Sequence, residues 1–418
     1  MYQKTVLPNG VRVVTEEPPH APAVSIGLWV ETGSRSEDPQ VNGICHFIEH
    51  LLFKGTKTRK AMDIAREIDS VGGALNAFTG RESTCAYAKV LPHDLRLGMA
   101  LLADIYMNSV FHQEEIEKER NVVLQEISMV EDTPDDLIHD LFCQGFWRGH
   151  PLGRPVLGTA ETVAALRREH IVSHFRTTYL PKSLVVAAAG RLKHRRAVRL
   201  VEEILPLPSL RPPHQNGGAP RCYQSIHVTT RPLEQVHLVV GTKGIPQAHP
   251  MRHACNVLNT ILGGGMSSRL FQEVREKRGL AYTVYSFQYG YSDAGMLGVY
   301  AGTSQDQLPR VIDLVLRELR SLKRRDVTKN ELKLAKEQIK GNLLLGTESA
   351  DSHMMRIARN EIAFGREVSI EESLRDIDRV TPDEIRFLAN ELFREEYLSL
   401  TVLGRVRRRD LPRDALCL

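Results

Sequence analysis

The sequence contains no long hydrophobic run. Its 418 residues are 42% hydrophobic and 25% charged, and no segment approaches the ~18 consecutive apolar residues that a membrane-spanning helix requires. This composition is typical of a soluble globular protein that buries sizeable cores. We therefore predict a protein that does not span a membrane. Because domains usually contain about 100 to 200 residues, we also expect two of them.

Cysteine is scarce, and neither sign of charge is in large excess. The six cysteines are scattered and form no Cys-x-x-Cys pair, which favours reduced thiols in a cytosolic protein over a disulfide framework. The net charge is only +4, and the sharpest basic run is 405–409 near the C-terminus, a pattern typical of a solvated tail. The composition therefore argues against nucleic acid as a partner.

The N-terminus lacks the charged segment and apolar stretch of a secretion signal. Residues 5–7 and 11–14 are rich in β-branched and apolar side chains and flank the turn sequence Pro8-Asn9-Gly10. This pattern predicts a β-hairpin. We expect a cytoplasmic protein.

A segment rich in proline and glycine divides the chain. Residues 205–220 concentrate these two residue types more than any other stretch. Prolines lack a backbone N–H group and favour an extended linker. We therefore predict one domain at 1–209, a linker at 210–220 and a second domain at 221–418.

The two halves of the chain end alike. Phe175 and Tyr179 precede a strand-like run that closes with Gly190-Arg191, and the same order recurs at Phe393–Arg405. Such a repeat indicates that the second half is a diverged copy of the first.

Each half shows strand signals first and charged helical stretches later. The runs 24–30 and 236–240 read as strands, whereas 113–131 and 327–345 carry helix-forming residues with apolar side chains at helical spacing. We predict two related α+β domains, each a mainly antiparallel sheet with helices packed on one face, produced by internal duplication.

One short segment carries the chemistry. Residues 42–55 are predicted to form a helix that ends at Gly55 and has one apolar stripe along it. His46, Glu49 and His50 fall on the other side, because successive residues are rotated by ~100°. Two imidazoles four residues apart can bind the same zinc ion. Glu49 lies between them, within reach of a water at that ion, in the inverted His-x-x-Glu-His order.

A catalytic zinc usually takes three protein ligands, so a third ligand must come from elsewhere. The best candidates lie in the charged helix at 113–131. Glu119 and Glu126 are seven residues apart and share one helix face. By spacing alone, either one could be the ligand.

These residues resemble the pitrilysin/insulinase family of zinc metallopeptidases, most closely the branch that contains mitochondrial processing peptidase and its single-chain bacterial relatives. The resemblance covers nearly the whole chain. It implies that His46, His50 and Glu126 bind Zn²⁺, that Glu49 is the base, and that Glu119 supports the site from outside the ligand set. Domain 1–209 would then be the zinc-binding catalytic domain.

The same resemblance implies how substrate binds. The family adds an extended peptide to a sheet edge, here the segment Asn76, Ala77, Phe78 and Thr79, through β-augmentation. In domain 221–418, Arg275 and Tyr282 match an Arg and Tyr pair that clasps the substrate and completes the site. Larger members use four such domains and this chain supplies two, so we expect a homodimer.

The sequence thus predicts a zinc metalloendopeptidase that hydrolyses unfolded peptides or protein segments. Zinc would activate a water, and Glu49 would act as its general base and return the proton to the leaving amine. The alternative is a non-catalytic peptide-binding or scaffolding subunit, because the resembled family contains such members. Those members typically have degraded metal motifs, whereas His46, Glu49, His50 and Glu126 are all present here.

Overall fold

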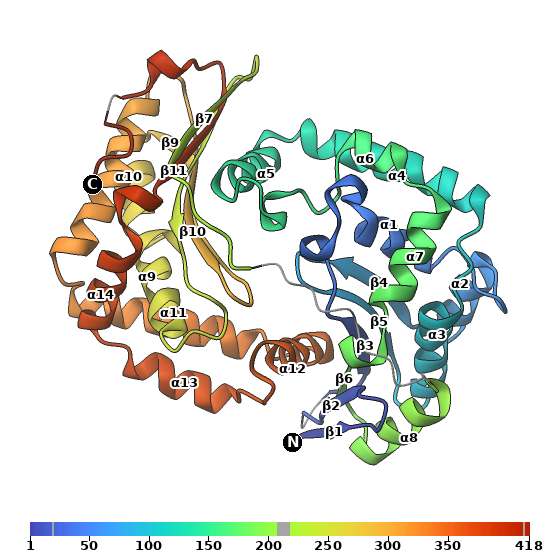
Figure 1. The fold of residues 1–418 in the computed structure, drawn as a ribbon. Helices are drawn as coiled ribbons and strands as arrows, with labels where there is room; N and C mark the ends of the chain where they lie inside the picture. The colour runs from blue at the N-terminus through green and yellow to red at the C-terminus, as the bar shows by residue number, and fades with distance from the viewer. Residues whose placement is uncertain (19–20, 207–217, 413) are drawn as a thin grey trace. The chain divides into compact units, whose positions relative to one another are not determined.

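The computed structural model describes residues 1–18, 21–206, 218–412 and 414–418. The chain forms two compact units, each built around one β-sheet (Figure 1). Unit 1 comprises Met1–Met129, Arg154–Gly217 and Leu345–Val368. Unit 2 comprises Val130–Gly153, Gly218–Leu344 and Ser369–Leu418.

The sheet of unit 1 has six strands in the order β1-β2-β6-β3-β5-β4. All neighbours pair antiparallel except β2 and β6, which are parallel. The first two strands form the hairpin predicted around Gly10. The strands are β1 (Tyr2–Val6), β2 (Arg12–Glu16), β3 (Val24–Val30), β4 (Ala74–Thr79), β5 (Thr84–Val90) and β6 (Leu184–Gly190).

The sheet of unit 2 has five strands in the order β7-β11-β8-β10-β9. Its one parallel pair is β7 with β11, and the other neighbours are antiparallel. The strands are β7 (Ser225–Thr230), β8 (Val236–Lys243), β9 (Ala281–Gly290), β10 (Gly295–Thr303) and β11 (Ser399–Gly404).

The two sheets share one topology. Adding five to each strand number converts the order β2-β6-β3-β5-β4 into β7-β11-β8-β10-β9, and the parallel pair falls at the same place in both. Coincidence of order and direction over five strands indicates a duplicated unit, in agreement with the sequence repeat. The predicted pair of related α+β domains is confirmed.

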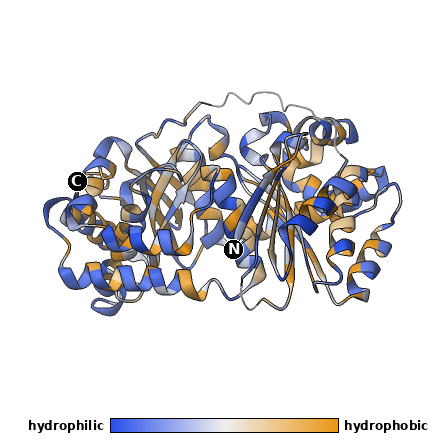
Figure 2. Ribbon diagram, turned by 90° about the horizontal axis from the view of Figure 1, so that it is seen from below, coloured by the Kyte–Doolittle hydropathy of each residue, from blue (hydrophilic) through white to orange (hydrophobic). Residues whose placement is uncertain are grey.

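One face of each sheet is covered by helices from the same half of the chain. In unit 1 the core contains alternate strand residues such as Ile26, Leu28 and Val186, packed against apolar helix side chains. Figure 2 shows hydrophilic and hydrophobic residues alternating along many of the helices, as expected for helices with one buried face. Apart from the motif helix and a helix within Leu345–Val368, the α-helices of unit 1 are α2 (Ala61–Ser70), α3 (Leu95–Asn108), α4 (Gln113–Glu131), α6 (Ala160–Ala165), α7 (Arg168–Thr178) and α8 (His194–Ile204).

The core of unit 2 is built in the same way from Leu238, Val240 and Val299 of the sheet and a set of amphipathic helices. Two of the predicted charged helices are found close to their expected bounds, 113–131 in unit 1 and 327–345 in unit 2. Apart from a helix within Val130–Gly153, the α-helices of unit 2 are α9 (Arg252–Gly263), α10 (Leu308–Arg324), α11 (Lys329–Leu345), α13 (Ile370–Arg379) and α14 (Pro382–Leu392).

The opposite face of each sheet carries a helix that the sequence reading did not include. Helix α5 (Pro134–Phe146), from the first half of the chain, packs on the sheet of unit 2 through Phe142 and Phe146. Helix α12 (Ala350–Phe364), from the second half, packs on the sheet of unit 1. The predicted domain ranges 1–209 and 221–418 therefore differ from the two units, because each half of the chain contributes one helix to the unit of the other half. Most of the predicted linker, 210–217, lies outside the described residues.

Helix α12 is held to unit 1 by both apolar and charged contacts. Met354 is fully buried, and its sulfur lies 3.3 Å from the indole nitrogen of Trp29. Glu16 on β2 accepts hydrogen bonds from His353, at 2.8 Å, and from Arg356, at 2.6 Å. Because α12 covers the second face, β3 and β6 are buried along their whole length.

Two further expectations can be checked against the fold. Among the described residues, no helix is long and apolar enough to cross a bilayer. All six cysteines are free thiols, as their spacing predicted.

Replacing Met354 by alanine should destabilise unit 1 by ~2–5 kcal/mol, because it leaves a cavity between α12 and the sheet. Chemical denaturation will measure the loss, and hydrogen exchange of Ala350–Phe364 will show whether α12 opens first. Met62→Ala is the control, since that side chain is 59% exposed and surface changes usually stay within ~0.5 kcal/mol. Equal stability of the two variants would contradict the packing role of α12.

Candidate metal centre

Helix α1 (Ile44–Leu52) contains the motif segment. Its N-terminus is held by the buried carboxylate of Glu37, which accepts hydrogen bonds from the backbone N–H groups of Gly43 and Cys45, each at 2.8 Å. This contact satisfies two of the four N–H groups that a helix leaves free at its start. Gly43 has φ +96°, and a Cβ there would lie 2.5 Å from a backbone oxygen. The role of Glu37 was not predicted from the sequence, although carboxylates are favoured near the N-terminus of a helix.

One face of α1 is completely buried against the sheet and neighbouring helices. The buried side chains are Ile44, Cys45, Phe47, Ile48, Leu51 and Leu52. His46, Glu49 and His50 are half-buried on the other face. The helix ends at Leu52 and not at Gly55 as predicted, because the N–H of Lys54 bonds to the carbonyl oxygen of Leu51 at 3.1 Å and closes a tight 3₁₀-type final turn.

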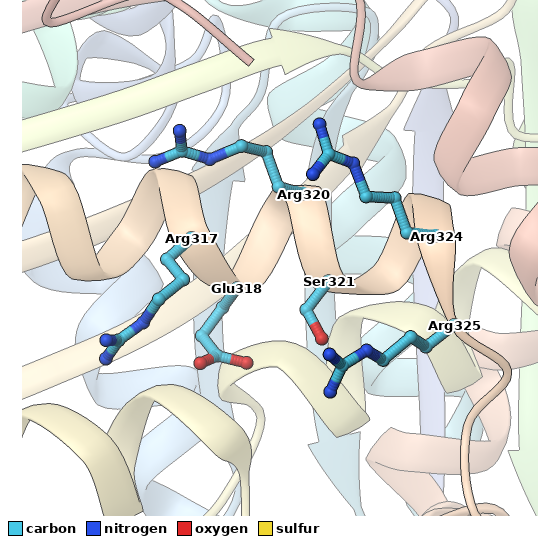
Figure 3. Close-up of a pocket in the computed structure, with 6 residues that line it drawn as sticks. All are labelled: Arg317, Glu318, Arg320, Ser321, Arg324 and Arg325. Atoms are coloured by element: carbon cyan, nitrogen blue, oxygen red, sulfur yellow. The ribbon is translucent and has the colours of Figure 1, made fainter.

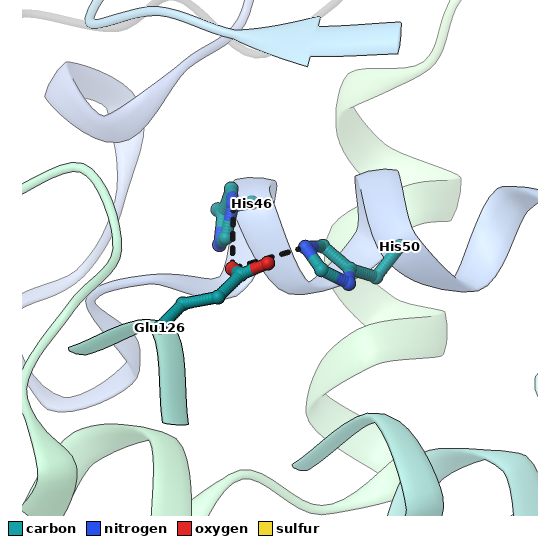
Figure 4. Close-up of side chains that lie close together, drawn as sticks. All are labelled: His46, His50 and Glu126. Atoms are coloured by element: carbon teal, nitrogen blue, oxygen red, sulfur yellow. Dashed lines mark ion pairs between the residues drawn. The ribbon is translucent and has the colours of Figure 1, made fainter. Parts of the chain in front are cut away.

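Three donor atoms converge beside α1. Oε2 of Glu126, on α4, lies 3.3 Å from Nε2 of His50 and 3.7 Å from Nε2 of His46 (Figure 4). The ligand atoms of these residues all lie within 4.8 Å of one another. In the part of the chain that the structure describes, no other group of three or more His, Cys, Asp or Glu side chains brings its ligand atoms this close together.

Glu119 occupies a different position from Glu126. Its Oε2 lies 3.1 Å from Nδ1 of His50, on the side of the ring that points away from Glu126. A carboxylate only accepts hydrogen bonds, so Nδ1 is the donor in this contact, and Nε2 is the nitrogen that would face a metal ion. The spacing of the sequence left both glutamates open as ligands. The structure brings Glu126 to the two Nε2 atoms and places Glu119 behind His50.

Burial controls the protonation of the motif residues. It lowers the pKa of His46 to about 4, with a smaller contribution from nearby His50. The His46 imidazole is therefore neutral at pH 7, which is the form that binds metals. Burial also raises the pKa of Glu49, against the opposing effects of Thr79 and His50, and the neighbouring carboxylate of Glu126 adds to the rise. A raised pKa suits a carboxylate that must take up and release a proton.

The donor set fits zinc. Two histidines and one glutamate are a known ligand set of catalytic zinc sites, and three protein ligands leave one position open. Ligands ~2.0–2.1 Å from a tetrahedral zinc lie roughly 3.3 Å from one another, close to the separations of Glu126 from His46 and His50.

Unit 2 keeps the framework of this site without its donors. Helix α9 buries Ala254, Cys255, Val257, Leu258, Ile261 and Leu262, which repeats the burial pattern of α1 at an offset of 210 residues. Asn256, Asn259 and Thr260 stand at the positions of His46, Glu49 and His50. On α11 the offset is 212 residues, because Ala335 and Ile339 pack on the core as Val123 and Ile127 of α4 do, and this places Gln338 at the position of Glu126. Amides and hydroxyls are poor zinc ligands, so the described residues of unit 2 provide no counterpart of this donor set.

Arg275 and Tyr282 lie together in unit 2. The Arg275 guanidinium lies 4.8 Å from the centres of the Phe271 and Tyr282 rings, between the two aromatic side chains. Tyr282 is 76% exposed. The structure thus brings the predicted pair into contact and presents it to solvent.

The predicted substrate segment, Asn76 to Thr79, belongs to β4. Strand β4 is the last strand of the sheet of unit 1, and its one strand neighbour is β5. An edge strand has one row of backbone N–H and C=O groups that no strand of its own sheet covers. The segment therefore has the backbone geometry that β-augmentation needs.

A separate pocket of about 490 Å³ lies on α10 of unit 2 (Figure 3). Its lining residues come only from α10 and the residue after it, namely Arg317, Glu318, Arg320, Ser321, Arg324 and Arg325. In Figure 3 their side chains leave the helix in different directions and do not converge on one point. This pocket has none of the organisation of the metal centre.

Comparison with known proteins agrees with this geometry. Residues 12–160 match the family model of insulinase (peptidase family M16), and residues 165–339 match that of the peptidase M16 inactive domain. The chain is 42% identical to an uncharacterized zinc protease of Streptomyces coelicolor over 98% of this chain and 91% of that one. It is 40% identical to an uncharacterized zinc protease of Bacillus subtilis, over 95% and 97% of the two chains.

Solved structures share the fold. A protease from Helicobacter pylori superposes with a TM-score of 0.90 at 21% identity, over 97% of this chain and 99% of that one. A peptidase M16 inactive domain protein from Pseudomonas fluorescens gives a TM-score of 0.89 at 21% identity, over 97% and 98% of the two chains.

We expect one zinc ion per wild-type chain, and His50→Ala or Glu126→Ala should lose most of it because each removes one of three ligands. Elemental analysis after dialysis will measure the metal content. Gln338→Ala is the matched control, since it truncates the counterpart of Glu126 in unit 2 and should keep full zinc content. Equal metal retention by Glu126→Ala and Gln338→Ala would contradict the ligand set.

Proposed function

This chain belongs to the insulinase (peptidase M16) family, and we propose that it is a zinc-dependent endopeptidase that acts on unfolded peptides or protein segments. The observation that carries the proposal is the convergence of His46, His50 and Glu126, with Glu49 on the same helix face. The relatives named as zinc proteases support the coarser assignment, a metalloprotease.

The residues would divide the work as follows. His46, His50 and Glu126 would hold the zinc ion. When bound, zinc supplies a Lewis acid that lowers the pKa of water towards ~7 and polarises a peptide carbonyl. Glu49 accepts the proton of the attacking water and then donates it to the leaving amine. Its burial, which raises its pKa, favours this return of the proton.

Substrate would bind as an added strand. The outer edge of β4 at Asn76 to Thr79 pairs with no other strand of its sheet. The N–H of Ala77 donates to Oδ1 of Asn76 at 2.8 Å, and the other backbone groups of this edge would bind an extended peptide. Most strands of a folded domain are already paired within its own sheets, so unfolded segments are the favoured substrates. Backbone recognition of this kind also implies broad selectivity among side chains.

Unit 2 would supply substrate contacts and no second metal. Tyr282 is exposed and stacked on Arg275, so both groups are available to a peptide. We propose that they position the substrate, as the sequence resemblance implies. The homodimer and the processing-peptidase branch rest on that resemblance alone and remain predictions.

The competing function is a non-catalytic peptide-binding subunit. Unit 2 illustrates what a degraded site looks like in this chain, with Asn256 and Thr260 where histidines stand in unit 1. In unit 1 all four residues are present, and the potential ligand atoms of His46, His50 and Glu126 lie within 4.8 Å of one another. This contrast favours catalysis.

Glu49→Gln should lower kcat by about 10²- to 10⁴-fold, the usual contribution of general acid–base catalysis, because the amide keeps the shape and loses the proton acceptor. Zinc content should not change. Turnover will be measured on an unstructured peptide library by mass spectrometry, with Glu131→Gln, at the exposed end of α4, as the control. A zinc-loaded Glu49→Gln protein with normal turnover would disprove the assignment of the base.

A further inference from the structure

We propose that Lys54 is a positioning residue of the metal centre, which acts on His50 through Glu119. This inference rests on the proposed function, because it assumes that His50 binds zinc. It adds a residue outside both the ligand set and the motif.

The three side chains form a continuous chain of contacts. Nζ of Lys54 lies 2.7 Å from Oε1 of Glu119, and Oε2 of the same carboxylate lies 3.1 Å from Nδ1 of His50. Both oxygens of Glu119 are therefore engaged, one by each partner. With its two oxygens tied in this way, the carboxylate has one orientation in which it can accept the Nδ1 hydrogen.

Burial makes this contact important. The Glu119 side chain is 7% exposed, whereas that of Lys54 is 34% exposed and reaches the surface. A buried carboxylate without a cation is costly, so loss of its partner favours rearrangement. Lys54 is the only Lys or Arg that pairs with Glu119 among the ion pairs of the described residues. Removing the ammonium should free the carboxylate to turn away from His50.

The fold fixes the place from which Lys54 reaches Glu119. Its backbone N–H bonds to the carbonyl oxygen of Leu51 at 3.1 Å, directly after α1 ends. The loop that follows is tied to α3 by Asp104, which accepts hydrogen bonds from Thr56, Thr58, Arg59 and Asn108. Lys54 thus stands between a helix end and an anchored loop, which limits the positions of its side chain.

The two histidines differ in this respect. Nδ1 of His46 is buried, and no hydrogen-bond partner for it lies among the described residues. Only His50 has its ring orientation set by a side chain outside the ligand set. Groups that orient a metal-binding histidine typically change metal affinity by 10- to 100-fold, so the contribution of Lys54 should be measurable.

The test is a double-mutant cycle on zinc affinity, read by competition with a fluorescent chelator. Lys54→Met should weaken zinc binding by about tenfold, and Lys54→Arg, which can still pair with Glu119, should restore most of it. Lys57→Met, a change of an exposed lysine three residues further along, is the control and should bind zinc normally. In the Glu119→Gln background, Lys54→Met should have no further effect.

Three results would overturn the proposal. The first is wild-type zinc affinity in Lys54→Met. The second is a loss of zinc affinity in Lys57→Met as large as that in Lys54→Met. The third is a loss in the Lys54→Met, Glu119→Gln double variant equal to the sum of the two single losses. The cycle is also separable from the proposed function. If wild-type protein binds zinc but cleaves no peptide, the proposed function fails, and the double-mutant cycle still tests whether Lys54 affects zinc affinity through Glu119. If wild-type protein binds no zinc, both fail.

Discussion

The packing of helix α1 against the sheet of unit 1 determines where the polar residues of the motif point. Six apolar side chains of this helix are buried, and burial of each large one stabilises the unit by ~1.5–3 kcal/mol. Because side chains on a helix repeat every ~3.6 residues, burying this face leaves His46, Glu49 and His50 together on the other one. Glu37 then holds the N-terminus of the helix, and α4 brings Glu126 to the two Nε2 atoms.

The duplicated unit separates the packing from the chemistry. Helices α1 and α9 bury the same positions, whereas the polar positions carry His, Glu and His in one and Asn, Asn and Thr in the other. The apolar pattern is what each sheet needs in order to form its core, so it is kept in both copies. The donors are needed only where a metal binds. The match to the peptidase M16 inactive domain, over residues 165–339, includes α9.

The sequence predicts the local features well because they depend on local patterns. The hairpin around Gly10, the strand at 24–30 and the helix at 113–131 all follow from spacing and turn residues. The spacing of Glu119 and Glu126 did not decide between them, because both lie on one face of α4. What decides is their height along the helix relative to α1, which is a tertiary property.

Other features depend on contacts between distant residues and were not predicted. Nothing in the pattern of 134–146 or 350–364 indicates that each helix packs on the sheet of the other half. Such an exchange requires knowledge of both sheets at once. Lys54 was missed for a similar reason, since its partner Glu119 is 65 residues away in the sequence. In isolation it reads as one lysine in a basic loop.

The proposed zinc ligands are two imidazoles and one carboxylate of unit 1. X-ray absorption at the zinc edge of the purified protein tests this ligand set most directly, because the spectrum reports the ligand atoms themselves. We expect nitrogen and oxygen atoms at ~2.0–2.2 Å from the zinc ion, with scattering from two imidazole rings. A sulfur neighbour at ~2.3 Å, the distance of a cysteine ligand, or the signal of a single imidazole would contradict this ligand set.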